Sequence, residues 1–425
     1  MSTLLSLGKV DQGAMPARKD QFLSLYHAEL SPDLQKMLKF RDEANKAWCD
    51  FEEISGTGVH ALQQFMKDAG FMPKANVDGI FGYATQAAVR LFQEYVRTVD
   101  NDPSIGAPDG AAGPNTLGHI EAWKQKKKGT AEFVCEWGRA NARNASQEFN
   151  QWIGLLSKAK QHYLNNPNPI VAFVDAFNKP TDTRKLKDWD TSPDTIHLLG
   201  IRRGQDASLS GTKRDNDDLF VLLINGMVFK FWGSTDPNPD LAKRSDIPFL
   251  VEGQHNYKFG WHKNDEGFVK LYRALRPKST GVLVFRDKNA DKALTPEDIV
   301  KGLDPDPNTT INIHWSGVGS YNFSAGCQVI AGKSYINHKN ALIDCSGFAA
   351  ASYDELGVKN RFGDRKGRGA YNVFADLVLT YAPPGVQSIV YTLGNDDTLF
   401  LSDVWNENFV KETVEKMKTP GIDGP

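Results

Sequence analysis

The sequence has few cysteines, no long apolar run and no excess of either charge, and each absence excludes a class of protein. Its four cysteines show no CxxC spacing, which argues against a disulfide framework. No window approaches the roughly 18 apolar residues of a membrane helix, so we expect no membrane segment. Lys and Arg number 50 against 52 Asp and Glu, so no overall field favours nucleic acid as a partner.

The length and the first residues set the expected organisation. A chain of 425 residues predicts two or three domains. The first nine residues have no basic segment before their short apolar run, so we expect no secretory signal and synthesis in the cytoplasm. Apolar residues near a 3.6-residue spacing predict an N-terminal helical segment over residues 1–55.

Two similar turns lie within residues 56–125. The first begins with Asp78 and Gly79, and the second with Asp109 and Gly110. In both turns another glycine follows three residues after the first glycine, and a threonine follows three residues later. Each Asp-Gly pair predicts a tight turn with glycine at positive φ. Apolar residues at helical spacing predict helices before, between and after the turns.

This doubled pattern, with an Ala-Val-x-x-Phe-Gln helix at residues 88–93, resembles the small three-helix peptidoglycan-binding domain found on many cell-wall enzymes. The resemblance implies anchoring to cell-wall glycan or stem peptide, with peptidoglycan as the partner. A generic helical bundle, in which the glycines only shape turns, is the alternative. The residues expected near the contact surface are Asp78, Gly79, Asp109 and Gly110.

The remaining chain changes pattern at about residue 190. We expect a helical spacer over residues 126–190 and a C-terminal tail over residues 406–425. Between them, in residues 191–405, short apolar runs bounded by turn residues predict a mostly β domain. Asn225 and Gly226 separate two such runs and predict a hairpin. The expected fold class is therefore α+β with several domains. The expected strands are 196–201, 219–224, 227–232, 281–285, 311–314 and 388–393.

A histidine and a cysteine stand at the ends of apolar runs in this β domain. His314 ends the run 311–314, and Cys327 follows a turn of small residues. A nearby imidazole lowers the pKa of a thiol and takes its proton, which makes the thiolate a nucleophile. A buried structural cysteine beside an unrelated histidine is the alternative.

The strand that ends in His314 and the Ser-x-Gly-Cys turn resemble the active-site signature of the L,D-transpeptidase family. The resemblance implies a β-rich catalytic domain in which Cys327 forms a thioester with peptidoglycan stem peptides and His314 is the base. It implies that the carbonyl group of Trp315 orients the imidazole ring. It also implies that Ser324 and Gly326 shape the turn, while backbone N–H groups around Gly326 and Cys327 form an oxyanion hole.

Two departures from that family concern the same turn. Ala325 stands where the family usually has histidine, and the gap from His314 to Ser324 is shorter than usual. The missing imidazole implies a wider pocket and a change in substrate positioning or proton transfer. The acyl acceptor is therefore left open. An amine would give cross-linking or exchange, and water would give L,D-carboxypeptidase or endopeptidase cleavage.

The segment 249–263 is expected to line the substrate cleft. His255, Tyr257 and His262 are its candidates for substrate binding, and the alternative for the histidines is a surface or loop position without such a role.

An acidic loop downstream has the spacing of a calcium site at Asp287, Asn289 and Asp291. However, Lys292 occupies the position at which such a loop needs glycine. We expect a polar turn without a metal there, with a structural Ca²⁺ as the alternative. We also expect a pair between Arg286 and Asp287, and no cofactor.

A second cysteine offers a rival nucleophile. Asp344 and Cys345 resemble the start of the nucleophile helix in NlpC-type peptidases, where the helix N-terminus depresses a thiol pKa. That family has its histidine downstream, whereas His338 is the last histidine of this chain. We therefore expect Cys345 to start a helix in a structural role. Both resemblances imply a peptidoglycan peptide as substrate.

The function expected from the sequence is a cell-wall-active cysteine acyltransferase or peptidase that acts on peptidoglycan stem peptides. A non-catalytic cell-wall-binding protein is the alternative, because of Ala325 and the shortened loop. Action in the periplasm or on the wall of a target cell would need delivery without a secretory signal. A phage lysis system or a contractile injection apparatus would supply it.

Overall fold

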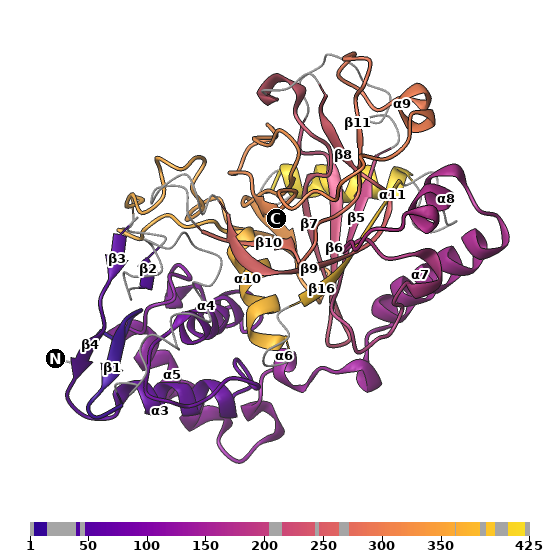
Figure 1. Ribbon diagram of the computed structural model, residues 1–425. Helices are drawn as coiled ribbons and strands as arrows, with labels where there is room; N and C mark the ends of the chain where they lie inside the picture. Colours follow the sequence, from indigo (N-terminus) through magenta and orange to yellow (C-terminus); the bar gives the residue numbers. More distant parts are fainter. Residues whose placement is uncertain are drawn as a thin grey trace. The chain divides into compact units, whose positions relative to one another are not determined.

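The computed structural model divides the chain into two compact units that do not follow chain order (Figure 1). Unit 1 comprises residues 1–140, 260–273 and 352–387, and unit 2 comprises residues 141–259, 274–351 and 388–425. The structure describes residues 4–14, 40–42, 47–203, 215–242, 246–262, 272–361, 363–382, 388–395 and 407–420.

Unit 1 begins with short strands instead of the predicted helices. The parallel pair joins β1 (Lys9–Asp11) to β4 (Glu52–Ile54), and the antiparallel pair joins β2 (Phe40–Asp42) to β3 (Ala47–Cys49). The helical prediction for residues 1–55 is therefore wrong here, and its part at residues 15–39 lies outside the described residues. Backbone hydrogen bonds between β1 and the turn at Gly79 and Phe81 override the weak helical periodicity.

Three helices follow, as predicted: α3 (Gly58–Asp68), α4 (Tyr83–Thr98) and α5 (Pro114–Lys127). They enclose an aromatic core in which Phe71 and Trp123 each pack edge-to-face on Phe92, with ring centroids 5.4 and 5.8 Å apart. Packing of this kind can be predicted from the apolar face of each helix, whereas the pairing of strands cannot.

A distant segment completes unit 1. Helix α10 (Ala370–Tyr381) packs against α4, where the buried carboxylate of Asp376 accepts hydrogen bonds from Arg90 at 2.6 and 2.8 Å. Arg273 donates to the same carboxylate at 3.3 Å. Residues 352–387 thus belong to unit 1, and the boundary predicted for a single β domain over 191–405 is wrong there.

Unit 2 is built on a ten-stranded sheet with the order β13-β12-β10-β9-β16-β5-β6-β7-β14-β15. Because β13 also pairs with β7, the first eight strands of this order form a closed circuit of hydrogen-bonded neighbours. The strands are β5 (His197–Arg202), β6 (Asp218–Ile224), β7 (Met227–Ser234), β9 (Gly253–His262), β10 (Tyr272–Pro277), β12 (Ile313–Trp315), β13 (Gln328–Ile330), β14 (Ser334–Ile336), β15 (Leu342–Asp344) and β16 (Ser388–Asn395).

The hairpin predicted at Asn225 and Gly226 is confirmed. Strands β6 and β7 pair in antiparallel with Ile224 opposite Met227, so the loop contains two residues. Asn225 has φ 49° and Gly226 has φ 76°. Two positive φ values are typical of a type I′ turn, whose twist matches that of the flanking strands.

Helices from both ends of unit 2 pack on this sheet. Trp152 and Leu156 of α7 (Gln147–Asn165) and Val414 of α11 (Glu407–Lys418) belong to the same core cluster as the strands. The helices predicted over 126–190 are present, but the predicted role of this segment as a spacer is wrong, as is the predicted tail over 406–425. Both segments carry apolar stripes whose partner surface is formed by strands far away in the sequence.

The other elements are short or peripheral. Strands β8 (Pro248–Leu250) and β11 (Val284–Arg286) form a separate antiparallel pair.

None of the described helices combines the length and apolar character needed to span a lipid bilayer. The remaining helices are α6 (Glu136–Arg139), α8 (Pro169–Ala176), α9 (Pro296–Val300), η1 (Pro103–Ile105), η2 (Ala131–Phe133), η3 (Ala142–Asn144), η4 (Leu186–Asp188) and η6 (Pro239–Leu241). The α+β class with a helical domain and a mostly β unit is as predicted.

Candidate functional site

His314 and Cys327 belong to neighbouring parallel strands of unit 2. His314 is the middle residue of β12, and Cys327 directly precedes β13. Ile313 lies opposite Gln328 in this pairing. A regular continuation of the register would set Cys327 opposite Asn312, on the sheet face that His314 also uses. The fold therefore brings His314 onto the strand next to the one that Cys327 precedes.

The imidazole of His314 is buried and held by the backbone of the next residue. Its Nδ1 atom lies 2.9 Å from the carbonyl oxygen of Trp315. A carbonyl oxygen only accepts hydrogen bonds, so Nδ1 carries the hydrogen in this contact. The neutral ring then has Nε2 as its basic nitrogen, which is the tautomer that a general base requires.

The thiol of Cys327 is partly exposed and contacts the backbone of the segment before β12. Its Sγ donates to the carbonyl oxygen of Thr310 at 3.2 Å, and the amide nitrogen of Asn312 donates to Sγ at 3.3 Å. The N–H of Asn312 favours the thiolate, because hydrogen bonds to a charged form stabilise it. The carbonyl of Thr310 favours the protonated thiol.

Ser324 organises the turn before Cys327. Its hydroxyl oxygen accepts hydrogen bonds from the amide nitrogens of Gly326 at 3.3 Å and Cys327 at 2.8 Å. These are the two N–H groups that the resemblance to L,D-transpeptidases implies as an oxyanion hole. In this structure they converge on one oxygen atom, but that atom belongs to the chain itself. A substrate oxyanion would have to displace this hydroxyl to use both donors.

Two buried asparagines anchor the same loop to the end of β7. The Asn322 side-chain nitrogen donates to the carbonyl oxygen of Asp236 at 2.6 Å. Asn238 donates from its side chain to the carbonyl oxygen of Asn322 at 2.8 Å, and from its backbone to that of Ser324 at 2.6 Å. Fully buried amides with these partners fix the loop, so the thiol sits on a preorganised turn.

Sequence reasoning missed several residues around the thiol. Phe323 is 50% exposed although it is apolar, and its ring packs edge-to-face on Tyr321 at 4.8 Å. The exposed ring of Phe323, supported by the half-buried Tyr321, offers an apolar surface in the loop before Cys327. Thr310 and Asn312 act through backbone atoms, for which the sequence carries no signal. Phe323 could have been found as an aromatic residue in the turn-rich loop.

His255 does not line a cleft. Its side chain is fully buried, with Nδ1 3.0 Å from the hydroxyl of Thr183 and Nε2 2.9 Å from the carbonyl oxygen of Val251. Burial lowers the pKa of His255 to about 4. Both ring nitrogens are therefore used inside the protein, and the prediction that His255 binds substrate is wrong.

Tyr257 is also a core residue. Its hydroxyl donates to the carbonyl oxygen of Ile311 at 3.0 Å, and its ring packs on Tyr391. Burial raises the pKa of Tyr257, and nearby Tyr391 and Cys327 add to the effect. The predicted substrate contact is wrong, since the side chain is completely enclosed. Its hydroxyl instead holds the strand that leads to His314.

His262 belongs to a different compact unit from Cys327. It is 5% exposed, and its ring lies edge-to-face on Tyr272 at 5.2 Å. The structure thus gives His262 a packing role in unit 1, and it does not place it in the site around Cys327. Its predicted substrate contact is not supported.

Cys345 is fully buried, and a turn follows it instead of a helix. The backbone nitrogen of Cys345 donates to the carbonyl oxygen of Lys333, while Phe348 and Ala349 donate to the carbonyl oxygen of Cys345. The expected helix start is therefore wrong. A thiol without a helix N-terminus and without solvent access lacks both features that would make it a nucleophile.

The acidic loop forms a compact turn in the structure. Carboxylate oxygens of Asp287, Asp291 and Asp298 lie within 4.8 Å of one another. Asp287 accepts from the backbone of Lys292 at 2.7 Å, and Asp298 accepts from the hydroxyl of Thr295 at 2.9 Å. Lys292 has φ 66°, at the position where a calcium loop needs glycine. Hydrogen bonds to the chain itself explain this cluster as the polar turn that was predicted.

The doubled turn of unit 1 is built around two glutamines. Gln63 of α3 donates to the carboxylate of Asp78 at 2.9 Å and to the hydroxyl of Thr85 at 3.0 Å, and accepts from the backbone of Gly79 at 2.8 Å. Gln93 of α4 makes the same set of contacts in the second turn. Its partners are Asp109 at 2.9 Å, Thr116 at 3.1 Å and the backbone of Gly110 at 2.9 Å.

Comparison with known proteins agrees with this geometry. Residues 55–99 match the family model of the peptidoglycan binding domain. The chain carries a peptidoglycan-binding domain. This supports peptidoglycan as a partner and association with the cell wall. No curated protein and no solved structure matches the chain.

The geometry of this peptidoglycan-binding domain separates the predicted contact residues. Asp78 and Asp109 are exposed, so their contact with the wall stays a prediction. Gly79 and Gly110 are buried, with φ values of 74° and 80°. An added Cβ atom would lie 2.9 Å from Ala14 at the first glycine and 2.8 Å from Arg90 at the second. The glycines therefore serve turn geometry and close packing, and their predicted wall contact is wrong.

Proposed function

We propose that this chain is a peptidoglycan-directed cysteine enzyme. It cleaves peptide bonds of stem peptides through a thioester on Cys327 and transfers the acyl group to an amine or to water. The observation that carries the proposal is the parallel pairing of β12 with β13, because His314 lies in β12 and Cys327 directly precedes β13. The same chain carries a peptidoglycan-binding domain. A module that binds the wall raises the local concentration of wall peptides near a second site.

The proposed reaction uses each residue at a stated atom. His314 accepts the thiol proton at Nε2, because Nδ1 is turned to the carbonyl oxygen of Trp315. The sulfur of Cys327 attacks the substrate carbonyl carbon, and a C–S bond forms. As the tetrahedral intermediate collapses, the C–N bond breaks and His314 returns the proton to the leaving amine. An amine or water then attacks the thioester and releases the thiol.

The acyl acceptor depends on the space beside Cys327. Ala325 is exposed and offers no imidazole to position or deprotonate an acceptor. We propose that an amine acceptor gives cross-linking or exchange, and that water gives carboxypeptidase or endopeptidase cleavage. We propose that the reaction takes place at the cell wall, because the peptidoglycan-binding domain attaches the chain there.

The test uses the full chain and purified sacculi. Wild type, Cys327→Ala and Cys345→Ala are incubated with sacculi, and the muropeptides are analysed by mass spectrometry. We expect wild type and Cys345→Ala to change the muropeptide profile, and Cys327→Ala to leave it unchanged. A Cys345→Ala variant that has lost activity while Cys327→Ala keeps it would reverse the assignment. Intact mass of the wild-type chain incubated with a stem peptide shows whether the thioester forms.

A non-catalytic wall-binding protein is the second candidate, and the contacts of Ser324 favour it. The hydroxyl of this serine already occupies the N–H groups of Gly326 and Cys327. A protein of this kind would bind sacculi as tightly when Cys327 is replaced, and wild type would leave the muropeptides unchanged. A sedimentation assay run on the same samples distinguishes this outcome from a failure to bind.

A further inference from the structure

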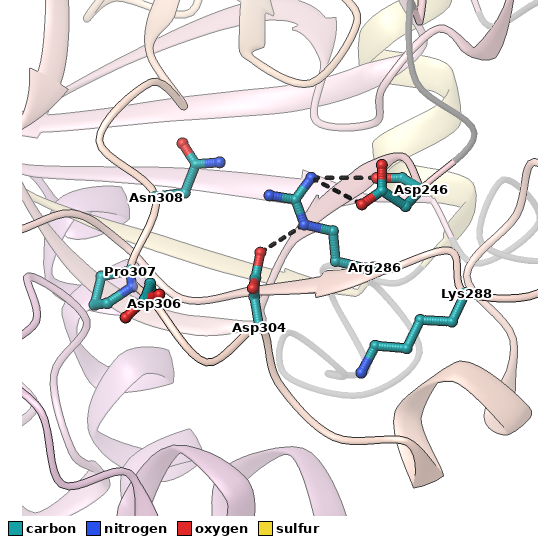
Figure 2. A pocket seen from close by; sticks show the side chains of 7 residues that line it. All are labelled: Asp246, Arg286, Lys288, Asp304, Asp306, Pro307 and Asn308. Atoms are coloured by element: carbon teal, nitrogen blue, oxygen red, sulfur yellow. Dashed lines mark hydrogen bonds and ion pairs between the residues drawn. The ribbon is translucent and has the colours of Figure 1, made fainter.

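Unit 2 contains a polar pocket of about 440 Å³. Figure 2 shows Arg286 at its centre, with Asp246 and Asp304 beside the guanidinium group and Asn308 across from it. The inference below rests on the proposed function for its biological meaning, but the binding it predicts is measured without catalysis.

The acidic groups of the pocket are engaged by cations of the protein itself. Arg286 donates from Nε to Asp304 at 2.6 Å and from Nη1 to the carbonyl oxygen of Asp246 at 3.2 Å. Asp306 pairs with Lys179 at 2.7 Å. The predicted pair between Arg286 and Asp287 is wrong, since Asp287 is occupied by its own loop. These carboxylates are therefore poor candidates for binding a cationic ligand.

Two hydrogen-bond donors of the pocket remain unused. Asn308 accepts from the backbone and hydroxyl of Thr310 through Oδ1, at 2.7 and 2.8 Å. This assignment leaves its Nδ2 as a donor. Within the described part of the chain, neither Nδ2 of Asn308 nor Nη2 of Arg286 makes a hydrogen bond. In Figure 2 these two nitrogens are turned toward the same space.

The backbone holds Asn308 in a fixed place. Asn308 and Val282 exchange two backbone hydrogen bonds, at 2.7 and 2.9 Å. Gly281 has φ 99°, and a Cβ atom there would lie 2.8 Å from the backbone of Asn308. A close approach of this kind restricts the backbone of Asn308, while the contacts of Thr310 with Oδ1 orient its side chain.

Two contact routes join this pocket to the nucleophile. Asn308 holds Thr310, whose carbonyl oxygen accepts from the Cys327 thiol at 3.2 Å. On the other side, Arg286 lies opposite Pro248 in the β8–β11 pair, and a Cβ atom on Gly326 would lie 3.0 Å from the Pro248 ring. Asn308 and Arg286 are therefore each linked, through one intervening residue, to the loop that carries Cys327.

We infer that Arg286 and Asn308 form a carboxylate-binding subsite for the substrate of Cys327. A guanidinium nitrogen and an amide nitrogen that face one space can each donate to one oxygen of the same carboxylate. Stem peptides carry carboxylates at two places near a scissile bond. One is the C-terminus of the leaving residue, and the other is the side-chain carboxylate of a diaminopimelate residue that donates the acyl group.

The test measures binding in the full chain with Cys327→Ala, which prevents turnover. The probes are a synthetic stem tetrapeptide with diaminopimelate at its third position, the same peptide with lysine there, and the C-terminal amide of each. Lysine lacks only the side-chain carboxylate, and the amide lacks only the terminal charge. We expect removal of one of these two carboxylates to weaken binding at least about tenfold, which identifies the source.

The decisive variant is Asn308→Asp, which keeps the acceptor for Thr310 and replaces the free donor by a negatively charged oxygen. We expect the preference for the carboxylate peptide to fall to within about twofold in this variant. Asp306→Asn removes a charge from the same pocket, and it should keep the preference. The inference fails if the parent chain binds all four peptides alike, or if Asn308→Asp keeps the preference.

The proposed function is judged separately by intact mass of the chain with Cys327 in place. If the carboxylate preference is present and no thioester forms with any of the peptides, the subsite stands and the enzyme proposal fails. If the thioester forms at equal rates from all four peptides, the enzyme stands and the subsite fails.

Discussion

The hydroxyl oxygen of Ser324 accepts a hydrogen bond from the backbone nitrogen of Cys327 at 2.8 Å, and it also accepts from Gly326. It thus provides the acceptor for both backbone N–H groups of the turn that carries the thiol. The sulfur itself contacts Thr310 and Asn312. The turn and the thiol therefore depend on different residues, which makes their contributions separable by mutation.

Ser324→Ala is expected to lower the free energy of unfolding by about 1–2 kcal/mol, because it leaves two backbone donors without their acceptor. The contacts of the sulfur stay in place, so the rate at which iodoacetamide alkylates Cys327 should stay within about threefold of wild type. Ser324→Thr keeps the hydroxyl and is the matched control. A loss of alkylation in the alanine variant, with stability unchanged, would show that the serine acts on the thiol directly.

The described cysteines are expected to differ sharply in reactivity. Cys327 is partly exposed, whereas Cys135 and Cys345 are buried. Burial raises the pKa of Cys135 to about 12, so its thiolate is scarce at pH 8. Short treatment of the folded chain with iodoacetamide, followed by peptide mapping, should find Cys327 labelled and the other two protected. The chain used carries Cys49→Ser, and labelling in denaturant is the control for complete reaction.

The sequence predicted those parts of the fold whose signals are local. Asn225 and Gly226 specify their own turn, and the Asp-Gly pairs specify theirs, because positive φ values depend on the residues themselves. The strand that carries His314 also followed from nearby residues, because the apolar run 311–314 is a local signal.

Other features depend on partners that are distant in the chain. Val414 and Trp152 carry apolar surface that any helix could carry, and only the sheet decides where it is buried. Polar contacts are harder still to predict. Arg286 pairs with Asp304 and Asp246 instead of its neighbour, and Thr310 reaches the thiol through its carbonyl oxygen.

His255 is expected to make stability depend on pH. Its pKa is about 4 in the folded chain and about 6.5 when unfolded. The unfolded state therefore binds a proton more readily, and stability falls as pH drops from about 6.5 toward 4. The loss reaches about 3 kcal/mol at the low end. Denaturant unfolding at pH 7 and pH 4.5 measures it.

The matched variants for this test are His255→Gln and His162→Gln. Glutamine at position 255 does not titrate, so the part of the pH dependence that belongs to His255 should disappear, although the variant is less stable at pH 7. His162 is exposed, and its replacement should leave the pH dependence as it is in wild type. An unchanged pH dependence in His255→Gln would contradict the assignment.

Gln63 and Gln93 provide the last prediction, because each joins a helix to an Asp-Gly turn of the peptidoglycan-binding domain. Gln63→Ala removes an acceptor from the backbone of Gly79 and a donor from Asp78 and Thr85. We expect a loss of about 2–3 kcal/mol in the free energy of unfolding, since buried polar groups lose their partners. Gln93→Ala should cost a similar amount, because its contacts in the second turn are the same in kind.

The neighbouring Gln64 supplies the control for these variants. It is exposed and, among the described residues, donates only to Asp68 on its own helix, at 2.8 Å. Gln64→Ala should therefore change stability by less than about 0.5 kcal/mol. Sedimentation with sacculi, measured at a temperature where all variants are folded, then tests the domain's function. If the turns present the wall-binding surface, Gln63→Ala and Gln93→Ala bind less than Gln64→Ala at equal folded fraction. Equal binding by all variants would place that surface away from the turns and leave the glutamines a purely structural role.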